Sequence, residues 1–130
     1  MNALGKQFGR VAIGAAIRCR AGALPKVAWA QEITHETSSP SSRSKSCPMH
    51  AFVGLADAGL IRGVSSRNAA QHSVNAEYAV AAVDFLRACP ELADAEHDLW
   101  QEIHRDRPRV IAHNGQLDVV LALWLNGDLV

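Results

Sequence analysis

The chain has 130 residues, of which 48% are hydrophobic, so it suits one domain with one core and is too apolar to be disordered. Its 13 basic and 13 acidic side chains balance, which excludes a general electrostatic attraction to nucleic acid or to an anionic membrane. No apolar run approaches the roughly 20 residues of a membrane span, so no membrane partner is expected. Three widely spaced cysteines (Cys19, Cys47 and Cys89) favour a reducing, cytoplasmic location over a disulfide framework.

The spacing of the apolar residues predicts six helices and almost no strand. The first helix covers residues 3–21, and the second begins at Pro25 and ends near residue 34. A polar stretch at residues 37–46 is a loop by composition. The third helix covers residues 48–59, with a proline at its start and a glycine at its end.

Three further helices are predicted in the second half of the chain. Ser73 is a suitable N-cap for the fourth, Asp94 for the fifth and Asn114 for the sixth. The sixth helix carries an apolar stripe and further apolar residues outside it (Leu117, Val119, Val120, Leu121, Ala122, Leu123, Trp124 and Leu125). Because it is apolar almost all round, we expect it to be either the central buried helix or a surface for dimerisation.

The two halves of the chain are similar in sequence. Residues 51–59 parallel residues 119–127, and the segment that follows Trp29 parallels the segment that follows Trp100. This indicates either a duplicated three-helix unit, with copies at residues 3–61 and 74–130, or a similarity that alanine-rich helices share by chance. The expected fold is therefore a compact all-α domain of six helices over residues 1–130, with two pseudo-repeated halves as a further suggestion.

The balanced net charge hides a segregation of charge along the chain. Up to Arg67 there are nine basic and three acidic side chains, whereas the remainder has four basic and ten acidic ones. Such segregation indicates complementary faces that meet, within or between chains, or one basic surface with a binding role. The alternative is clustering by chance on two solvated surfaces.

Two motifs in the sequence are distinctive. One is C-P-x-x-A-F-x-G-L, which begins at Cys47, and the other is H-N-x-Q-x-D-V-V-L-A-L-W, which begins at His113. Together with the region of Trp29 and with Tyr78-Ala79-Val80, these motifs resemble a family of small bacterial proteins of unknown function. The resemblance implies a compact helical domain in the cytoplasm, and it supplies neither an activity nor a cofactor.

Cys47 is the strongest candidate for chemistry in the sequence. A helix N-terminus and the neighbouring cations Arg43 and Lys45 favour the thiolate, which is the reactive form of cysteine. His113 and Asn114 would complete a Cys/His/Asn set if the starts of the third and sixth helices face each other. The alternative is that Cys47 and Asn114 only cap their helices, since no local signature of a thiol enzyme surrounds Cys47.

The polar loop before the third helix offers groups that could bind a phosphate. Ser39, Arg43 and Lys45 supply a hydroxyl and two cations ahead of a helix N-terminus. The loop lacks the glycines of a P-loop, so a solvated connector is the alternative. No metal or other cofactor is expected, because the best ligand group (His35, Cys47 and His50) lacks a fourth member.

The end of the third helix, L-x-x-x-G-L-I from Leu55, is similar to the end of the third helix in helix-turn-helix modules. The basic half of the chain would then face DNA. Residues 48–61 nevertheless contain no Arg, Lys, Asn or Gln, the side chains that most often read base edges.

These observations lead to three functional hypotheses. The first is a non-enzymatic protein-interaction module that binds either another protein or a second copy of itself, because charge is segregated and the last helix carries excess apolar surface. The second is a nucleic-acid-associated regulator that uses the basic half, and the third is a thiol-dependent enzyme that uses Cys47. Residue types alone do not select among them.

Overall fold

The all-α fold is confirmed by the computed structural model, which describes residues 2–67, 73–107 and 109–130. The helices are η1 (Ala3–Gly5), α1 (Gln7–Arg20), α2 (Pro25–Glu36), α3 (Pro40–Arg43), α4 (Ser46–Asp57), α5 (Val74–Ala88), η2 (Pro90–Asp94), α6 (Glu96–His104) and α7 (Gln116–Leu125). The six predicted helices correspond to α1, α2, α4, α5, α6 and α7. The stretch at residues 37–46 is not loop throughout, because Ser39 caps the short helix α3 by accepting a hydrogen bond from the N–H of Ser42.

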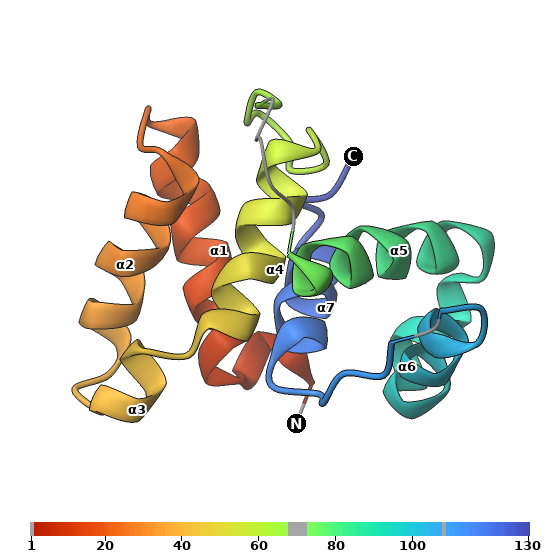
Figure 1. Ribbon diagram of the computed structural model, residues 1–130. Helices are drawn as coiled ribbons and strands as arrows, with labels where there is room; N and C mark the ends of the chain where they lie inside the picture. The colour runs from red at the N-terminus through yellow and green to blue at the C-terminus, as the bar shows by residue number, and fades with distance from the viewer. Residues whose placement is uncertain (1, 68–72, 108) are drawn as a thin grey trace.

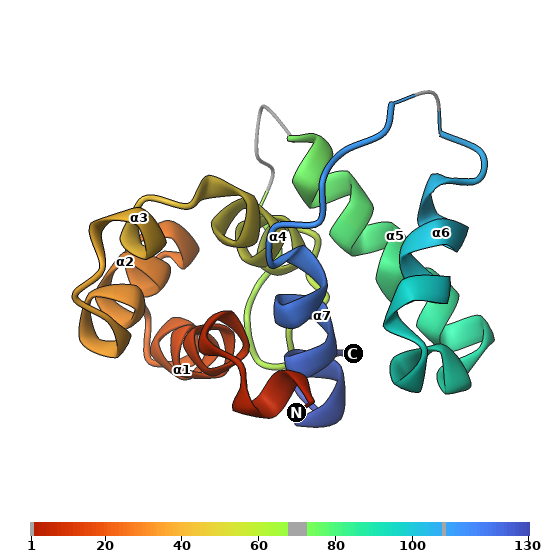
Figure 2. The same cartoon turned by 90° about the horizontal axis from the view of Figure 1, so that it is seen from below.

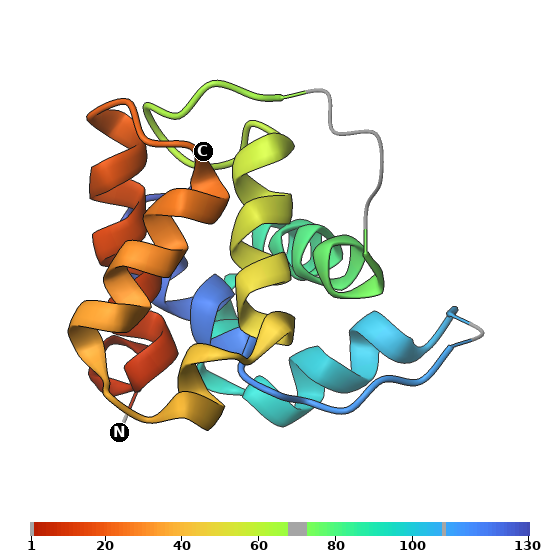
Figure 3. The same cartoon turned by 60° about the vertical axis from the view of Figure 1, so that its left-hand side comes forward.

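Helices α4 and α7 lie at the centre of the molecule, with α1 and α2 on one side and α5 and α6 on the other (Figure 1). Helix α7 packs against α1, α4 and α5, and α4 packs against α2, α5 and α7. Figure 2 shows the same arrangement from below, with α7 between α1 and α5. Helix α2 lies on the outside of α1 (Figure 3), so one long face of α2 remains uncovered. No described helix is long and apolar enough to span a membrane.

Helix α7 is the central buried helix, which was one of the two predictions made for it. Every residue from Gln116 to Leu123 is buried except Asp118. Burial on all sides explains why this helix has no polar face, because each side of it meets another helix. The excess apolar surface that suggested dimerisation through the last helix is therefore part of the core.

Helices α4 and α5 cross at very short range. A Cβ atom placed on Gly54 would lie 2.4 Å from the Cβ atom of Ala76, so neither residue can be larger without moving a helix. The start of α5 is set by Ser73, whose Oγ accepts a hydrogen bond from the N–H of Ala76 at 3.1 Å. The cap predicted at Ser73 is thus confirmed.

The other two predicted caps are wrong. Asp94 lies within η2, and α6 begins after Ala95 without a side-chain cap. The N-cap of α7 is Gly115, which has φ of +94°. The N–H of Asn114 instead donates to Oε1 of Gln116 at 2.6 Å, so the glutamine side chain closes this turn. At neither helix start does a side chain accept a hydrogen bond from the first N–H groups.

The segments that follow α4 and α7 meet in an antiparallel bridge between Ile61 and Leu129. The N–H of Arg62 donates to the carbonyl of Asp128 at 2.7 Å, and that of Val130 donates to the carbonyl of Leu60 at 2.9 Å. These two bonds would be equivalent under the suggested duplication, since residues 51–59 parallel residues 119–127. The duplication itself stays a prediction.

Candidate functional site

The starts of α4 and α7 face each other, as the thiol hypothesis required. A Cβ atom on Gly115 would lie 3.4 Å from Cβ of Pro48. Their side chains have different surroundings, however: Cys47 is half-buried in the first turn of α4, whereas Nε2 of His113 lies 3.1 Å from Oε1 of Glu96. No hydrogen bond joins Cys47 to His113 or Asn114 within the described residues. The Cys/His/Asn set is therefore not assembled.

The suggested phosphate ligands do not converge on one point. Ser39 uses its hydroxyl to cap α3, and Arg43 donates to the carbonyls of Thr37 and Thr34 at 2.6 and 2.9 Å. Lys45 lies over the ring of Phe8, with its Nζ 5.7 Å from the ring centroid. The three side chains therefore make contacts within the protein: Ser39 and Arg43 form hydrogen bonds to the backbone, and Lys45 contacts an aromatic ring.

Helix α4 offers little surface for reading DNA. Its residues Pro48, Ala51, Phe52 and 54–57 are buried, and α4 packs against α2, α5 and α7. The face that stays exposed or half-exposed (Ser46, Met49, His50 and Val53) carries no Arg, Lys, Asn or Gln. Arg62, a cation of the basic half, donates to the carbonyls of Gly127 and Leu129. The described residues therefore give no support to a helix-turn-helix reader built on α4.

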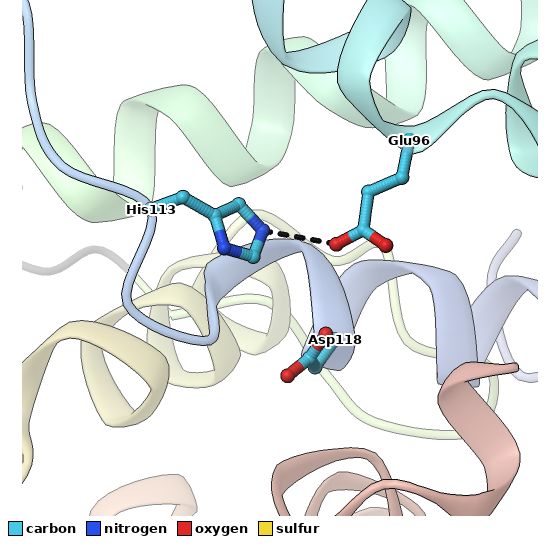
Figure 4. Close-up of side chains that lie close together, drawn as sticks. All are labelled: Glu96, His113 and Asp118. Atoms are coloured by element: carbon cyan, nitrogen blue, oxygen red, sulfur yellow. Dashed lines mark ion pairs between the residues drawn. The ribbon is translucent and has the colours of Figure 1, made fainter. Parts of the chain in front are cut away.

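The residues considered for a metal are also apart. His35 is exposed on α2, while Cys47 and His50 lie in α4. A different group brings three donor atoms within 4.8 Å of one another: Glu96, His113 and Asp118. Figure 4 shows the imidazole of His113 directed at the Glu96 carboxylate, with Asp118 on the adjacent turn of α7. The sequence does not signal this group, because Glu96 belongs to α6 and lies far from the others along the chain.

Lys6 completes this group, which we call the Lys6 cluster (Lys6, Glu96, His113 and Asp118). Its Nζ lies 3.4 Å from a carboxylate oxygen of Glu96 and 3.4 Å from one of Asp118. Burial lowers the pKa of Lys6, but the charges of Asp118 and Glu96 outweigh it and leave that pKa raised. The cluster ties the start of α1 to the starts of α6 and α7.

The position of His113 is set by an aromatic neighbour. Its ring meets the indole of Trp100 edge-on, with centroids 5.0 Å apart and an interplanar angle of 83°. Trp100 also contacts His104 edge-on, at a centroid distance of 4.6 Å. Nε2 of His104 in turn accepts a hydrogen bond from the N–H of Ile111 at 3.3 Å, which holds the segment before His113. The orientation of His113 toward Glu96 thus follows from packing.

A second candidate site is an open hollow of about 1080 Å³ on α1 and α2, which we call the α2 hollow. It is lined by apolar, polar and basic residues from both helices and from the loop after α4 (Arg18, Leu24, Lys26, Val27, Ala30, Gln31, Thr34, His35 and Arg67). Leu24 is 53% exposed and Val27 is 46% exposed, and Ile17 of α1 is 58% exposed. This face is the clearest example of large apolar side chains left in water among the described residues.

Only some of the described basic residues in the first half of the chain form ion pairs with acidic residues in the second half. Lys6 pairs with Glu96 and Asp118, and Arg20 pairs with Asp128, so some basic residues of the first half do contact acidic residues of the second. Other charges have no ion-pair partner within the described part of the chain. Among the exposed ones are Lys26 and Arg67 at the α2 hollow, and Glu91, Asp94 and Asp98 in η2 and α6.

A family model matches residues 5–130, nearly the whole length of the chain. The chain belongs to a family of unknown function, DUF6979. The resemblance to such a family is therefore confirmed. No curated protein and no solved structure matches the chain. A function must be argued from the two candidate sites.

Proposed function

We propose that this chain is a cytoplasmic protein-interaction module that self-associates, with the α2 hollow of one copy receiving the acidic end of another. The observation that carries the proposal is the α2 hollow itself, in which exposed Leu24 and Val27 lie beside Lys26 and Arg67. These two cations form no ion pair with any residue that the structure describes. The three cysteines are all free thiols, which supports a reducing compartment.

The apolar part of the contact is supported by burial. Exposed apolar side chains are stabilised by removal from water, at about 25 cal/mol for each Å² covered. Since α7 is buried, the exposed apolar side chains of Ile17, Leu24 and Val27 become the natural place for a partner.

The charged part of the contact identifies the partner. Lys26 and Arg67 would repel an identical basic hollow, so two hollows do not pair with each other. Glu91, Asp94 and Asp98 provide the opposite charge at the end of the molecule formed by η2 and α6. Figure 1 shows α2 and α6 at opposite ends of the molecule, so this contact joins unlike surfaces and is heterologous.

The test is sedimentation velocity over a range of protein concentrations at low and high salt. We expect the weight-average sedimentation coefficient to rise with concentration, and to rise less in high salt, because exposed charge pairs are screened. Val27→Glu should remove the rise, since it places a carboxylate in the α2 hollow. The matched control is Val130→Glu, because Val130 is similarly exposed, at 47%, and lies outside both the hollow and the acidic end.

Two results would overturn the proposal. One is a strictly monomeric wild-type protein at millimolar concentration in low salt. The other is an equal loss of association in Val27→Glu and Val130→Glu when circular dichroism shows both variants to be folded. Either result would show that the α2 hollow does not mediate self-association.

A further inference from the structure

We propose that Glu96, His113 and Asp118 form a binding site for a divalent transition-metal ion, which would compete with the ammonium group of Lys6 for the two carboxylates. The donor set is one imidazole nitrogen and two carboxylates, which suits Zn²⁺ and its neighbours in the first transition row. Three protein ligands leave a fourth position for water, as in zinc sites that are not fully closed.

The geometry requires only small movements of side chains. All three donor atoms lie within 4.8 Å of one another, and Nε2 of His113 is already 3.1 Å from Oε1 of Glu96. Ligands at about 2.1 Å from a tetrahedral zinc ion are roughly 3.4 Å apart, so donors that lie as much as 4.8 Å apart must approach by up to about 1.4 Å. The carboxylates can do this by side-chain rotation, and the edge-on contact with Trp100 keeps the imidazole in place.

The site is accessible to an ion from solution and carries an excess of negative charge. The side chains of Glu96 and His113 are 34% and 32% exposed, and that of Asp118 is 16% exposed. Two carboxylates face one lysine, so a neutral His113 leaves the cluster with one uncompensated negative charge. A divalent ion would compensate this negative charge. Lys6, which is attached to the same site, would compete with the ion for the two carboxylates.

The fold does not depend on the ion. Glu96 lies in the first turn of α6 and Asp118 in the first turn of α7, where helix dipoles favour negative charge. Lys6 supplies a further counter-charge. Substitution of a single ligand should therefore leave the protein folded, and metal binding can be measured apart from folding.

The experiment is a titration of the full chain with Co²⁺, followed by its visible absorption bands, and competition with Zn²⁺. We expect one Co²⁺ per chain in the wild type. His113→Ala should weaken binding more than about tenfold, because it removes the nitrogen ligand. Lys6→Met should tighten binding with the same absorption bands, since the competing cation is gone. The matched control is His97→Ala, because His97 is an exposed histidine of the same helix as Glu96 and lies outside the cluster.

Thermal unfolding with and without Zn²⁺ gives a second measurement, because an ion that binds only the folded state raises Tm. Zn²⁺ should raise the Tm of the wild type and of His97→Ala, and not that of His113→Ala. The proposal is overturned if the folded wild type binds no Co²⁺ at millimolar concentration. It is equally overturned if His113→Ala binds as tightly as the wild type, or if Lys6→Met binds no more tightly.

Discussion

Helices α7 and α2 show that apolar residues can have opposite environments in one small fold: they are buried in α7 and partly exposed on α2. Helix α7 is apolar on nearly every side and lies between α1, α4 and α5, so seven of its residues are buried. Helix α2 buries Ala28, Trp29 and Ile33 and leaves Val27 46% exposed. The difference lies in the number of neighbours, since α7 is surrounded and α2 is an outer helix.

The comparison teaches that an apolar helix is evidence for a binding surface only after its neighbours are known. Apolar residues on all sides suggested that the last helix was either central or a dimer surface, and the structure places it at the centre. The free apolar surface lies instead on α1 and α2, where polar and charged neighbours interrupt the pattern.

The largest effect is expected from truncation of a leucine in α7. Leu123→Ala removes a side chain that is 0% exposed and should lower the free energy of unfolding by about 2 to 5 kcal/mol, because it leaves a cavity. Val27→Ala in α2 should change it by no more than about 0.5 kcal/mol. Urea denaturation measures both. A loss of similar size in the two variants would contradict the assignment of α7 to the core and α2 to the surface.

A smaller effect is expected at the turns that precede the two helices. Gly115, before α7, has φ of +94°, and an added Cβ would lie 2.8 Å from the ring of Phe8. Gly22, before α2, has φ of +112° and open space around it. Gly22→Ala should cost about 1 kcal/mol from backbone strain alone. Gly115→Ala should cost about 1 to 3 kcal/mol more, because it also overpacks the site.

Thermal unfolding followed by circular dichroism measures both substitutions under one condition. Equal losses in Gly22→Ala and Gly115→Ala would show that the start of α7 is no more tightly packed than the start of α2. That result would contradict the claim that α7 is more closely surrounded than α2.

Much of the fold could be predicted from the sequence, because helices depend on local patterns. The spacing of apolar residues predicted all six long helices, and Ser73 was correctly assigned as a cap. Caps at Asp94 and Asn114 failed, since a cap depends on where the oxygen points as well as on the residue type. The side chain of Gln116 takes over at α7, and no local pattern indicates this.

The candidate sites could not be predicted in the same way, because both depend on packing between distant segments. The Lys6 cluster joins residues from the start of the chain, from α6 and from α7, and none of the four belongs to a local motif for ligands. Cys47 and His113 looked promising because the starts of α4 and α7 do meet. His113 nevertheless makes its contacts elsewhere, because its ring packs on Trp100 and points to Glu96.

The central claim, that the α2 hollow binds the acidic end of a second copy, is tested most directly by mixing two charge-reversed variants. One carries Lys26→Glu and Arg67→Glu, and the other carries Asp94→Lys and Asp98→Lys. Each variant alone has like charges at both surfaces and should sediment as a monomer, whereas an equimolar mixture should associate again. A mixture that stays monomeric under conditions where the wild type associates would contradict the claim.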